Sequence, residues 1–261
     1  MFNIINSLKK SESKNLVFVI QSKSDVKNIS EISDNKAVKE KLNTLVDGEK
    51  STKLELFIWE KYCETIYFFV IAKHDEPQLV DFIWAQAKTL PENFTYCVQN
   101  DKNLSILLKS IFLSNYSFDE YKSKKQEKNY IVLVDKSLEE HVKREKELIE
   151  NICLARDLGE TPSNYLYPES FAKIVKETTW KNTKIKILTP KQIEKKWMWL
   201  LHAVGKWSIH KPYVVIMERI IDKKLPTIWL VWKWVTFDTG WIQVKPGDHM
   251  YEMKWDMWGS A

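Results

Sequence analysis

The chain has 261 residues, of which 44% are hydrophobic and 29% charged, and its formal net charge is +5. This composition excludes an intrinsically disordered chain and does not by itself argue for nucleic-acid binding. The longest apolar run, residues 66–72, is far shorter than the roughly 18 residues that span a bilayer, so we expect no membrane partner. The first residues carry no secretory signal, and Cys63, Cys97 and Cys153 form no C-x-x-C pair. We therefore expect a cytoplasmic protein with reduced thiols.

Short apolar runs and helical repeats alternate along the first half of the chain. Four runs rich in β-branched and aromatic residues are typical of strands covered on both faces: 16–20, 54–59, 66–72 and 130–134. Between them, residues 77–90 and 104–112 place apolar side chains at helical spacing. Interleaved strands and helices predict an α/β domain over residues 1–136.

A charged helix is expected to follow this domain, over residues 137–159. Ser137 and Glu140 have the spacing of a capping box at its start, and Gly159 is expected to stop it. Apolar residues keep helical spacing between these two ends. A long amphipathic helix between two α/β regions indicates a linker helix between domains.

Residues 160–261 predict a second α/β domain. We expect a helix over residues 168–177, with Pro168 in its first turn, and strands over residues 184–188, 213–217 and 227–231. This series is too short for a complete domain of its kind. We therefore expect it to be the N-terminal part of a longer domain.

Most common catalytic motifs are absent from the sequence. It contains no H-E-x-x-H, no G-x-S-x-G and no G-x-G-x-x-G, and residues 205–208 lack the preceding glycine of a phosphate-binding loop. The five histidines share no metal-ligand spacing: His74, His141, His202, His210 and His249. The basic stretch of residues 122–128 is either a solvated loop or an electrostatic docking patch.

The most informative stretch lies between residues 231 and 257. It reads V-W-K-W-V-T-F-D-T-G, then V-K-P-G, then E-M-K-W-D-M, and it directly follows an expected apolar strand. Residues just beyond the carboxyl end of a strand in an α/β sheet line the crevice where ligands bind. Taken alone, two lysines and two aspartates at this place form either a salt-bridged loop or a binding site.

This stretch resembles the metal-binding signature of the leucine aminopeptidase (cytosol aminopeptidase) family, which reads roughly V-G-K-G-x-T-F-D-T-G-G-x-x-x-K-P and then E-M-K-x-D-M-x-G. The sequences A-R-D-L at residues 155–158 and T-P-S-N at residues 161–164 are similar to the start of the family's catalytic domain. The resemblance is strong over residues 150–261. It implies a macro-like N-terminal α/β domain, a long linker helix, and then the first part of an α/β aminopeptidase catalytic domain.

The resemblance assigns roles to four residues. Lys233 and Asp256 would bind one metal of a two-metal centre, Asp238 would bridge both metals, and Lys245 would be the catalytic lysine that stabilises the developing oxyanion. Carboxylate oxygens suit Mn²⁺ or Zn²⁺, and a lysine can ligate only when nearby cations favour loss of its proton. Two divalent ions roughly 3.5–4 Å apart would activate a shared water and polarise the peptide carbonyl.

The sequence departs from the family pattern in two ways. It has no counterpart of the downstream D-x-E-G-R stretch, which supplies two further ligands and the catalytic arginine, so we expect this chain to be inactive alone. The chain also holds 12 tryptophans and only 6 glycines. Tryptophan stands where the family has glycine at Trp232, Trp234, Trp241 and Trp258, and also at Trp197, Trp199 and Trp207. Three explanations are open: a one-base codon effect or decoding assumption, drift in a decayed gene, and adaptive aromatic residues.

The resemblance predicts a metal-dependent aminopeptidase that releases N-terminal amino acids, leucine among the favoured ones, from peptide substrates in the cytoplasm. By the same resemblance the complete protein would assemble as a homo-hexamer. Two alternatives stay open. One is a non-catalytic, degenerate homologue, and the other is a nucleic-acid-binding or regulatory protein that uses the basic stretch and the many aromatic residues.

Overall fold

The structure is a computed structural model that describes residues 2–11, 13–29, 35–60, 63–72, 76–125, 129–240, 242–257 and 259. It divides into two compact units, residues 1–153 and 154–261, and each unit is treated by itself below. His74, Trp241, Trp258 and residues 126–128 of the basic stretch lie outside the described residues. The domain boundaries expected from the sequence stay a prediction.

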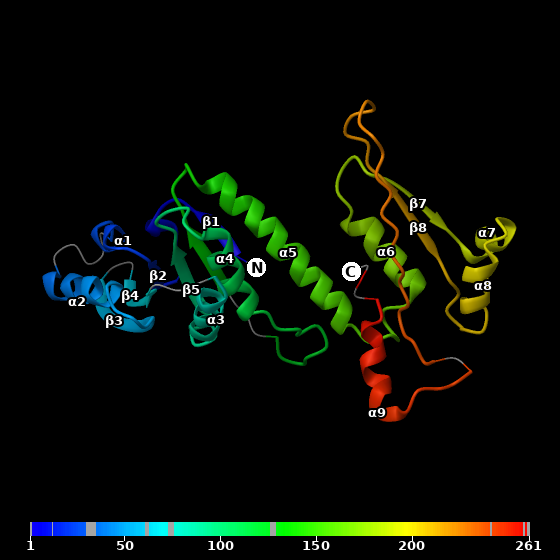
Figure 1. The fold of residues 1–261 in the computed structure, drawn as a ribbon, viewed down its shortest axis with the longest axis horizontal. Coiled ribbons are helices and arrows are strands. Elements are labelled where there is room, and N and C mark those ends of the chain that lie inside the picture. Colours follow the sequence, from blue (N-terminus) through cyan, green and yellow to red (C-terminus); the bar gives the residue numbers. More distant parts are fainter. Residues whose placement is uncertain are drawn as a thin grey trace. The chain divides into compact units, whose positions relative to one another are not determined.

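A six-stranded sheet organises the first unit (Figure 1). Its strands are β1 (Phe2–Ile5), β2 (Asn15–Ile20), β3 (Thr52–Glu60), β4 (Cys63–Val70), β5 (Asn93–Cys97) and β6 (Asn129–Leu133), in the spatial order β1-β6-β5-β2-β4-β3. All neighbouring strands are parallel except β3, which is antiparallel to β4. The first unit is therefore an α/β domain with a mostly parallel sheet, as the sequence predicts.

Helices cover both faces of this sheet. They are α1 (Lys23–Lys27), α2 (Lys36–Val46), α3 (Glu76–Ala87), α4 (Leu104–Ser114) and α5 (Glu139–Glu160), with a short 3-10 turn, η1 (Leu8–Lys10), between β1 and β2. Val17 and Val19 of β2 pack in one core with residues of α3, α4 and α5, whereas Phe18 packs in a second core with Leu42 of α2. Successive side chains of a strand point to opposite faces, so both faces of β2 are buried. This double burial explains why its sequence is continuously apolar.

The apolar runs of the first half are confirmed as strands, and its two predicted helices are confirmed as α3 and α4. The runs correspond to β2, β3, β4 and β6, whereas the sequence analysis missed β1, β5, α1 and α2. Both ends of α5 also differ, because the helix begins at Glu139, two residues after Ser137, and continues through Gly159 to Glu160. Its last turn is closed by Thr161, whose backbone N–H donates to the carbonyl of Asp157 at 3.0 Å. Pro162 follows, and a residue before proline is disfavoured in helical conformation.

The second unit contains a small two-stranded sheet, a set of short helices and a limited apolar core. Its elements are α6 (Pro168–Thr178), β7 (Lys184–Leu188), α7 (Pro190–Lys195), α8 (Trp199–Gly205), β8 (Val214–Glu218), α9 (Gly247–Met250) and the 3-10 turn η3 (Tyr251–Trp255). β7 and β8 are antiparallel. The core buries Leu158, Leu166 and Met257, and Phe171 and Trp234 pack against them. No helix among the described residues has the length and apolar character needed to cross a membrane.

The strand expected over residues 227–231 is not formed. This segment is without regular secondary structure, and Ile228, Leu230 and Val231 are 79%, 66% and 90% exposed. A strand requires a neighbour for its backbone N–H and C=O groups, and in the described part of this unit only β7 and β8 pair. The apolar pattern therefore gave a wrong prediction here, because a pattern records burial but does not supply a partner.

Trp197 adopts a backbone conformation that glycine favours. Its φ is 57°, in the left-handed region. It follows the C-cap of α7, where its N–H donates to the carbonyl of Glu194 at 3.0 Å and the N–H of Met198 donates to the carbonyl of Ile193 at 3.3 Å. These two bonds form a Schellman ending, in which glycine usually occupies the left-handed place. The indole of Trp197 is 73% exposed, so its burial does little to offset the unfavourable backbone.

We predict that Trp197→Gly stabilises the protein. Relief of the left-handed conformation is worth about 1–2 kcal/mol, and loss of the edge contact with Trp199 offsets part of it, leaving a net gain of about 1 kcal/mol in the free energy of unfolding. Scanning calorimetry measures the change. Trp180→Gly is the matched control, because Trp180 is also exposed but has no left-handed φ, so this variant should be no more stable than the parent. Equal effects of the two substitutions would refute the strain argument.

Candidate metal site

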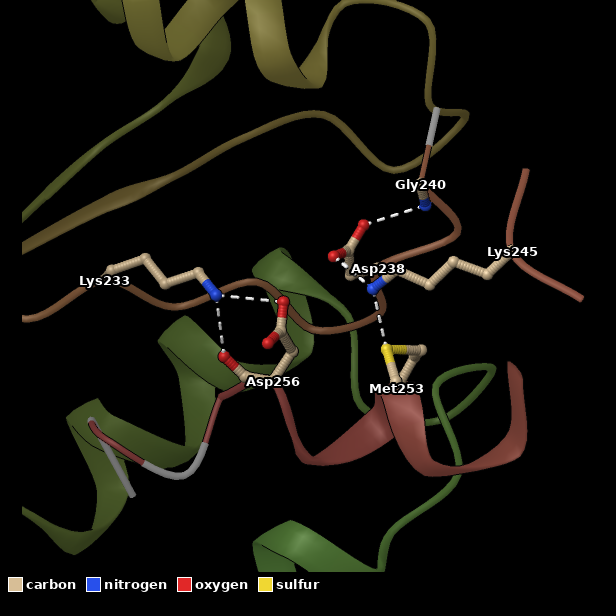
Figure 2. A network of polar contacts seen from close by, with 6 residues as sticks. All are labelled: Lys233, Asp238, Gly240, Lys245, Met253 and Asp256. Carbon is tan, nitrogen blue, oxygen red and sulfur yellow. Dashed lines mark hydrogen bonds and ion pairs between the residues drawn. The ribbon is translucent and has the colours of Figure 1, made fainter. Parts of the chain in front are cut away.

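The four site residues predicted from the sequence lie in one network of polar contacts in the second unit (Figure 2). Lys233 and Asp238 come from the irregular segment that follows β8, Lys245 precedes α9, and Asp256 follows η3. The structure joins them as two ion pairs, one between Lys233 and Asp256 and the other between Lys245 and Asp238. The roles of Lys233, Asp238 and Asp256 as metal ligands and of Lys245 as the catalytic lysine stay a prediction.

The first pair holds the end of η3 to the segment that carries Lys233. The Nζ of Lys233 donates to Oδ2 of Asp256 at 2.9 Å and to its backbone carbonyl at 3.2 Å. The Lys233 side chain is 61% exposed and that of Asp256 is 32% exposed. Because solvent screens such a pair, its contribution to stability is about 1 kcal/mol or less.

The second pair lies in a tight loop between Asp238 and Lys245. The Nζ of Lys245 donates to Oδ2 of Asp238 at 2.6 Å, while the backbone N–H of Gly240 donates to Oδ1 of the same carboxylate at 2.9 Å. The backbone N–H of Lys245 donates to the carbonyl of Thr239 at 3.0 Å and closes the loop. Gly240 has a φ of +83°, and a Cβ there would collide with the carbonyl of Gln243, so this position requires glycine.

These contacts favour the ionised form of Asp238. The hydrogen bond from Lys245 is the largest cause that lowers the pKa of Asp238, followed by the bond from the Gly240 N–H, and the charge of Lys233 adds a smaller effect. Lys233 therefore acts electrostatically on Asp238 although it is paired with Asp256. The two ion pairs form one electrostatic cluster.

The residues of this cluster fit a divalent cation only in part. The carboxylate oxygens of Asp238 and Asp256 are suitable ligands for Mn²⁺ or Zn²⁺. Each carboxylate, however, is neutralised by a lysine, and nowhere in the described ranges do three or more His, Cys, Asp and Glu side chains come together to hold a metal ion. A cation would have to compete with the ammonium groups for these carboxylates and find further ligands.

Trp234, next to Lys233, is crowded. Its ring centroid lies 3.1 Å from that of Phe171, closer than the roughly 4.5–7 Å at which aromatic rings pack. Its Nε1 is buried, and no hydrogen-bond partner for it occurs in the described part of the chain. A buried indole N–H without a partner is unfavourable, so this position holds a side chain larger and more polar than its surroundings suit.

A third ion pair supports the cluster and was missed in the sequence analysis. Lys254 is buried and its Nζ lies 2.9 Å from Oε2 of Glu160, at the end of α5. The sequence offered one signal, since a lysine between apolar and aromatic neighbours in the E-M-K-W-D-M stretch has to bury its charge. Its partner could not be identified, because Glu160 is 94 residues away along the chain.

The basic stretch offers weak support for nucleic-acid binding. In its described part, Lys122 pairs with Asp119 and Lys125 pairs with Glu120. These acidic neighbours reduce the positive charge that phosphate binding requires. A separate shallow hollow, lined by Lys186, Leu188, Lys195, Lys196, Met198 and Ile216, shares no residue with the ion-pair cluster.

Comparison with known proteins supports the resemblance of the signature. Residues 153–261 match the catalytic domain of the cytosol aminopeptidase family. A probable cytosol aminopeptidase of Wolbachia pipientis is 40% identical over 164 residues, which cover 58% of this chain and 32% of that protein. One from Corynebacterium diphtheriae is 43% identical over 115 residues, covering 44% of this chain and 23% of the relative. The chain thus spans a third or less of the length of these relatives.

Solved structures share the fold. The cytosol aminopeptidase of Coxiella burnetii has a TM-score of 0.69 and 22% identity, covering 98% of this chain and 54% of that one. The bottromycin maturation enzyme BotP in complex with Mn has a TM-score of 0.69 and 18% identity, covering 94% of this chain and 53% of its own. At these identities the similarity establishes the α/β fold and not the activity. The predicted fold class is confirmed.

We predict that the Asp238–Lys245 pair loses its contribution to stability only in acid. The folded pKa of Asp238 is lowered from its ordinary value of 3.8, so the contribution is present above that pH and is lost as the pH falls through the lowered pKa. Since the carboxylate is 38% exposed, the contribution is below about 1 kcal/mol. Melting temperatures of the parent and of Asp238→Asn should differ at pH 6 and converge near pH 2. A constant difference would contradict the pairing.

A second prediction concerns the crowding of Trp234. A well-packed tryptophan costs about 3–5 kcal/mol when it is replaced by alanine, and here relief of the overlap with Phe171 should reduce the cost of Trp234→Ala to about 1 kcal/mol or less. Leu166→Ala is the control, because Leu166 is 2% exposed in the same core and should show the ordinary cost of about 2–5 kcal/mol. Denaturant unfolding measures both. A loss of 3 kcal/mol or more at Trp234 would show that the indole is well packed.

Proposed function

We propose that this chain, which belongs to the cytosol aminopeptidase family, is part of a metal-dependent aminopeptidase. The observation that carries the proposal is the match of residues 153–261 to the family's catalytic domain, together with the convergence of Lys233, Asp238, Lys245 and Asp256 in one polar network. The chain spans 54% of the Coxiella burnetii enzyme that it resembles in fold, so activity is a proposal for the whole protein.

In this proposal Asp238 and Asp256 would supply oxygen ligands, and Lys233 would supply an amine ligand. Two bound Mn²⁺ or Zn²⁺ ions would lower the pKa of a shared water and polarise the substrate carbonyl. Mn is the metal of the complex with BotP. Displacement of Lys245 from Asp238 would leave its ammonium group available to stabilise the oxyanion that forms on the peptide carbonyl.

The substrates that we propose are peptides with a free N-terminus, leucine among the favoured first residues. We further propose that the complete protein works in the cytoplasm as a homo-hexamer. Names of relatives as probable cytosol aminopeptidases support the reaction class. Substrate preference and assembly follow only from the family resemblance.

We propose that residues 1–261 alone do not hydrolyse peptides. Two carboxylates and one amine leave most coordination positions of two dications to water, and both carboxylates are occupied by ammonium groups. The non-catalytic homologue remains the alternative, and the crowded Trp234 is the observation that favours it.

The test is titration of the chain with Mn²⁺, followed by isothermal calorimetry and by an assay with leucine anilide. We expect weak Mn²⁺ binding and no hydrolysis. Asp256→Asn and Asp238→Asn should each weaken binding by at least about tenfold, because each removes the negative charge of a proposed ligand. Asp248→Asn is the control, since Asp248 lies in α9 outside the network and should leave the affinity unchanged.

Two results would contradict these assignments. Mn²⁺ affinity that is the same in the parent, Asp256→Asn and Asp238→Asn would remove both aspartates from the proposed ligand set. Hydrolysis of leucine anilide by residues 1–261 would overturn the proposed inactivity while supporting the proposed reaction.

A further inference from the structure

We infer that Lys254 and Glu160 are positioning residues that hold the Asp256 turn at the candidate metal site. The inference rests on the proposed function, because it assigns these two residues a role in presenting a proposed ligand. Glu160 ends α5, and Lys254 lies in η3, two residues before Asp256. Both belong to the second unit.

Lys254 is the one charged side chain that is buried among the described residues of this unit, with 8% of its side chain exposed. Its Nζ lies 2.9 Å from Oε2 of Glu160, 3.5 Å from the Glu160 carbonyl oxygen and 3.3 Å from the hydroxyl of Tyr251. It also lies 4.7 Å from the centre of the Tyr251 ring and 5.4 Å from that of Trp255. An ammonium group has three donors, and here each can be directed at an oxygen.

Burial by itself would be unfavourable for this charge. The contacts of its Nζ with Oε2 of Glu160 at 2.9 Å and with the hydroxyl of Tyr251 at 3.3 Å offset this cost. The folded protein therefore retains a buried ammonium group that depends on Glu160. Removing one partner of such a pair leaves the other charge buried and uncompensated.

The contact between Lys254 and Glu160 also helps to fix the position of Asp256. The backbone N–H of Asp256 donates to the carbonyl of Met253 at 3.4 Å, and Met257, the next residue, is completely buried in the core with Leu158 of α5. The Sδ of Met253 lies 2.8 Å from the Nζ of Lys245. The η3 turn is thus fixed to the end of α5 and contacts both ion pairs of the site.

A metal ligand must be held within about 0.5 Å of its productive position, and a short 3-10 turn does not achieve that alone. The anchor explains why a charged residue occupies a buried position in this turn. Lys254 and Glu160 touch neither substrate nor metal in this scheme. They act through Asp256.

The experiment compares Lys254→Met, Lys254→Arg and Glu160→Gln in the 261-residue chain. Hydrogen exchange of residues 251–257, followed by mass spectrometry, reports the order of the turn without any metal. We expect exchange in Lys254→Met and Glu160→Gln to be at least about tenfold faster than in the parent, and Lys254→Arg to restore most of the protection because arginine keeps the charge and the donors. Lys173→Met is the control, since Lys173 pairs with Glu169 on the exposed face of α6.

Mn²⁺ affinity is the second readout. If Lys254 and Glu160 only stabilised the fold, Mn²⁺ affinity would not change in parallel with hydrogen exchange from one variant to the next. We expect Lys254→Met and Glu160→Gln to weaken binding at least about tenfold, with Lys254→Arg close to the parent and Lys173→Met unchanged. Unchanged exchange at residues 251–257, or faster exchange spread evenly over the second unit, would overturn the positioning role. If the parent binds no Mn²⁺, the proposed function fails for this chain, and the exchange data still decide the inference.

Discussion

Two ion pairs between lysine and aspartate govern the conformation of the candidate metal site. Asp238 and Asp256 each carry a lysine of the same chain, so the cluster is electrically balanced without any added ion. This balance lets two carboxylates lie in one network without mutual repulsion. It also affects any metal binding, because a cation would compete with a lysine at each carboxylate. Under the proposed function, Lys233 would itself become a ligand, and Lys245 would turn its charge toward a substrate oxygen.

In the first unit, the sequence predicted those strands and helices whose apolar pattern follows directly from burial. β2, β4 and β6 are covered on both faces, so their apolar runs identified them directly. β5 was missed because its sequence, N-F-T-Y-C, includes polar residues, although four of its five residues are buried. The 227–231 segment shows the opposite failure, since it has the sequence of a buried strand and is largely exposed. At the site, the sequence identified the charged residues, but which lysine pairs with which aspartate depends on the conformation of irregular loops, which no periodicity records.

Trp197 and Trp234 both lie at positions that suit a tryptophan poorly. Trp197 occupies a left-handed helix ending, and Trp234 is pressed against Phe171 with a buried, unpartnered N–H. Neither arrangement uses the indole for recognition, since the first ring is mostly in solvent and the second is too crowded to stack. Adaptive aromatic residues therefore explain these two positions poorly. A codon effect and drift in a decayed gene both explain them. The two explanations differ in what they predict for the gene: only a codon effect requires the tryptophan codons to fall at positions where the backbone suits glycine.

The two sides of the metal site differ in how firmly they are held. On the Asp256 side, a buried ammonium group and the fully buried Met257 fix the turn to α5. On the Lys233 side, the chain is irregular, Val231, Trp232 and Lys233 are exposed, and Trp234 is crowded. Under the proposed function, a change from paired charges to bound metal would therefore involve movement of Lys233 more than of Asp256. Replacement of Trp234 by a small residue would remove the main packing contact that opposes this movement, and it would leave the Lys254–Glu160 anchor intact.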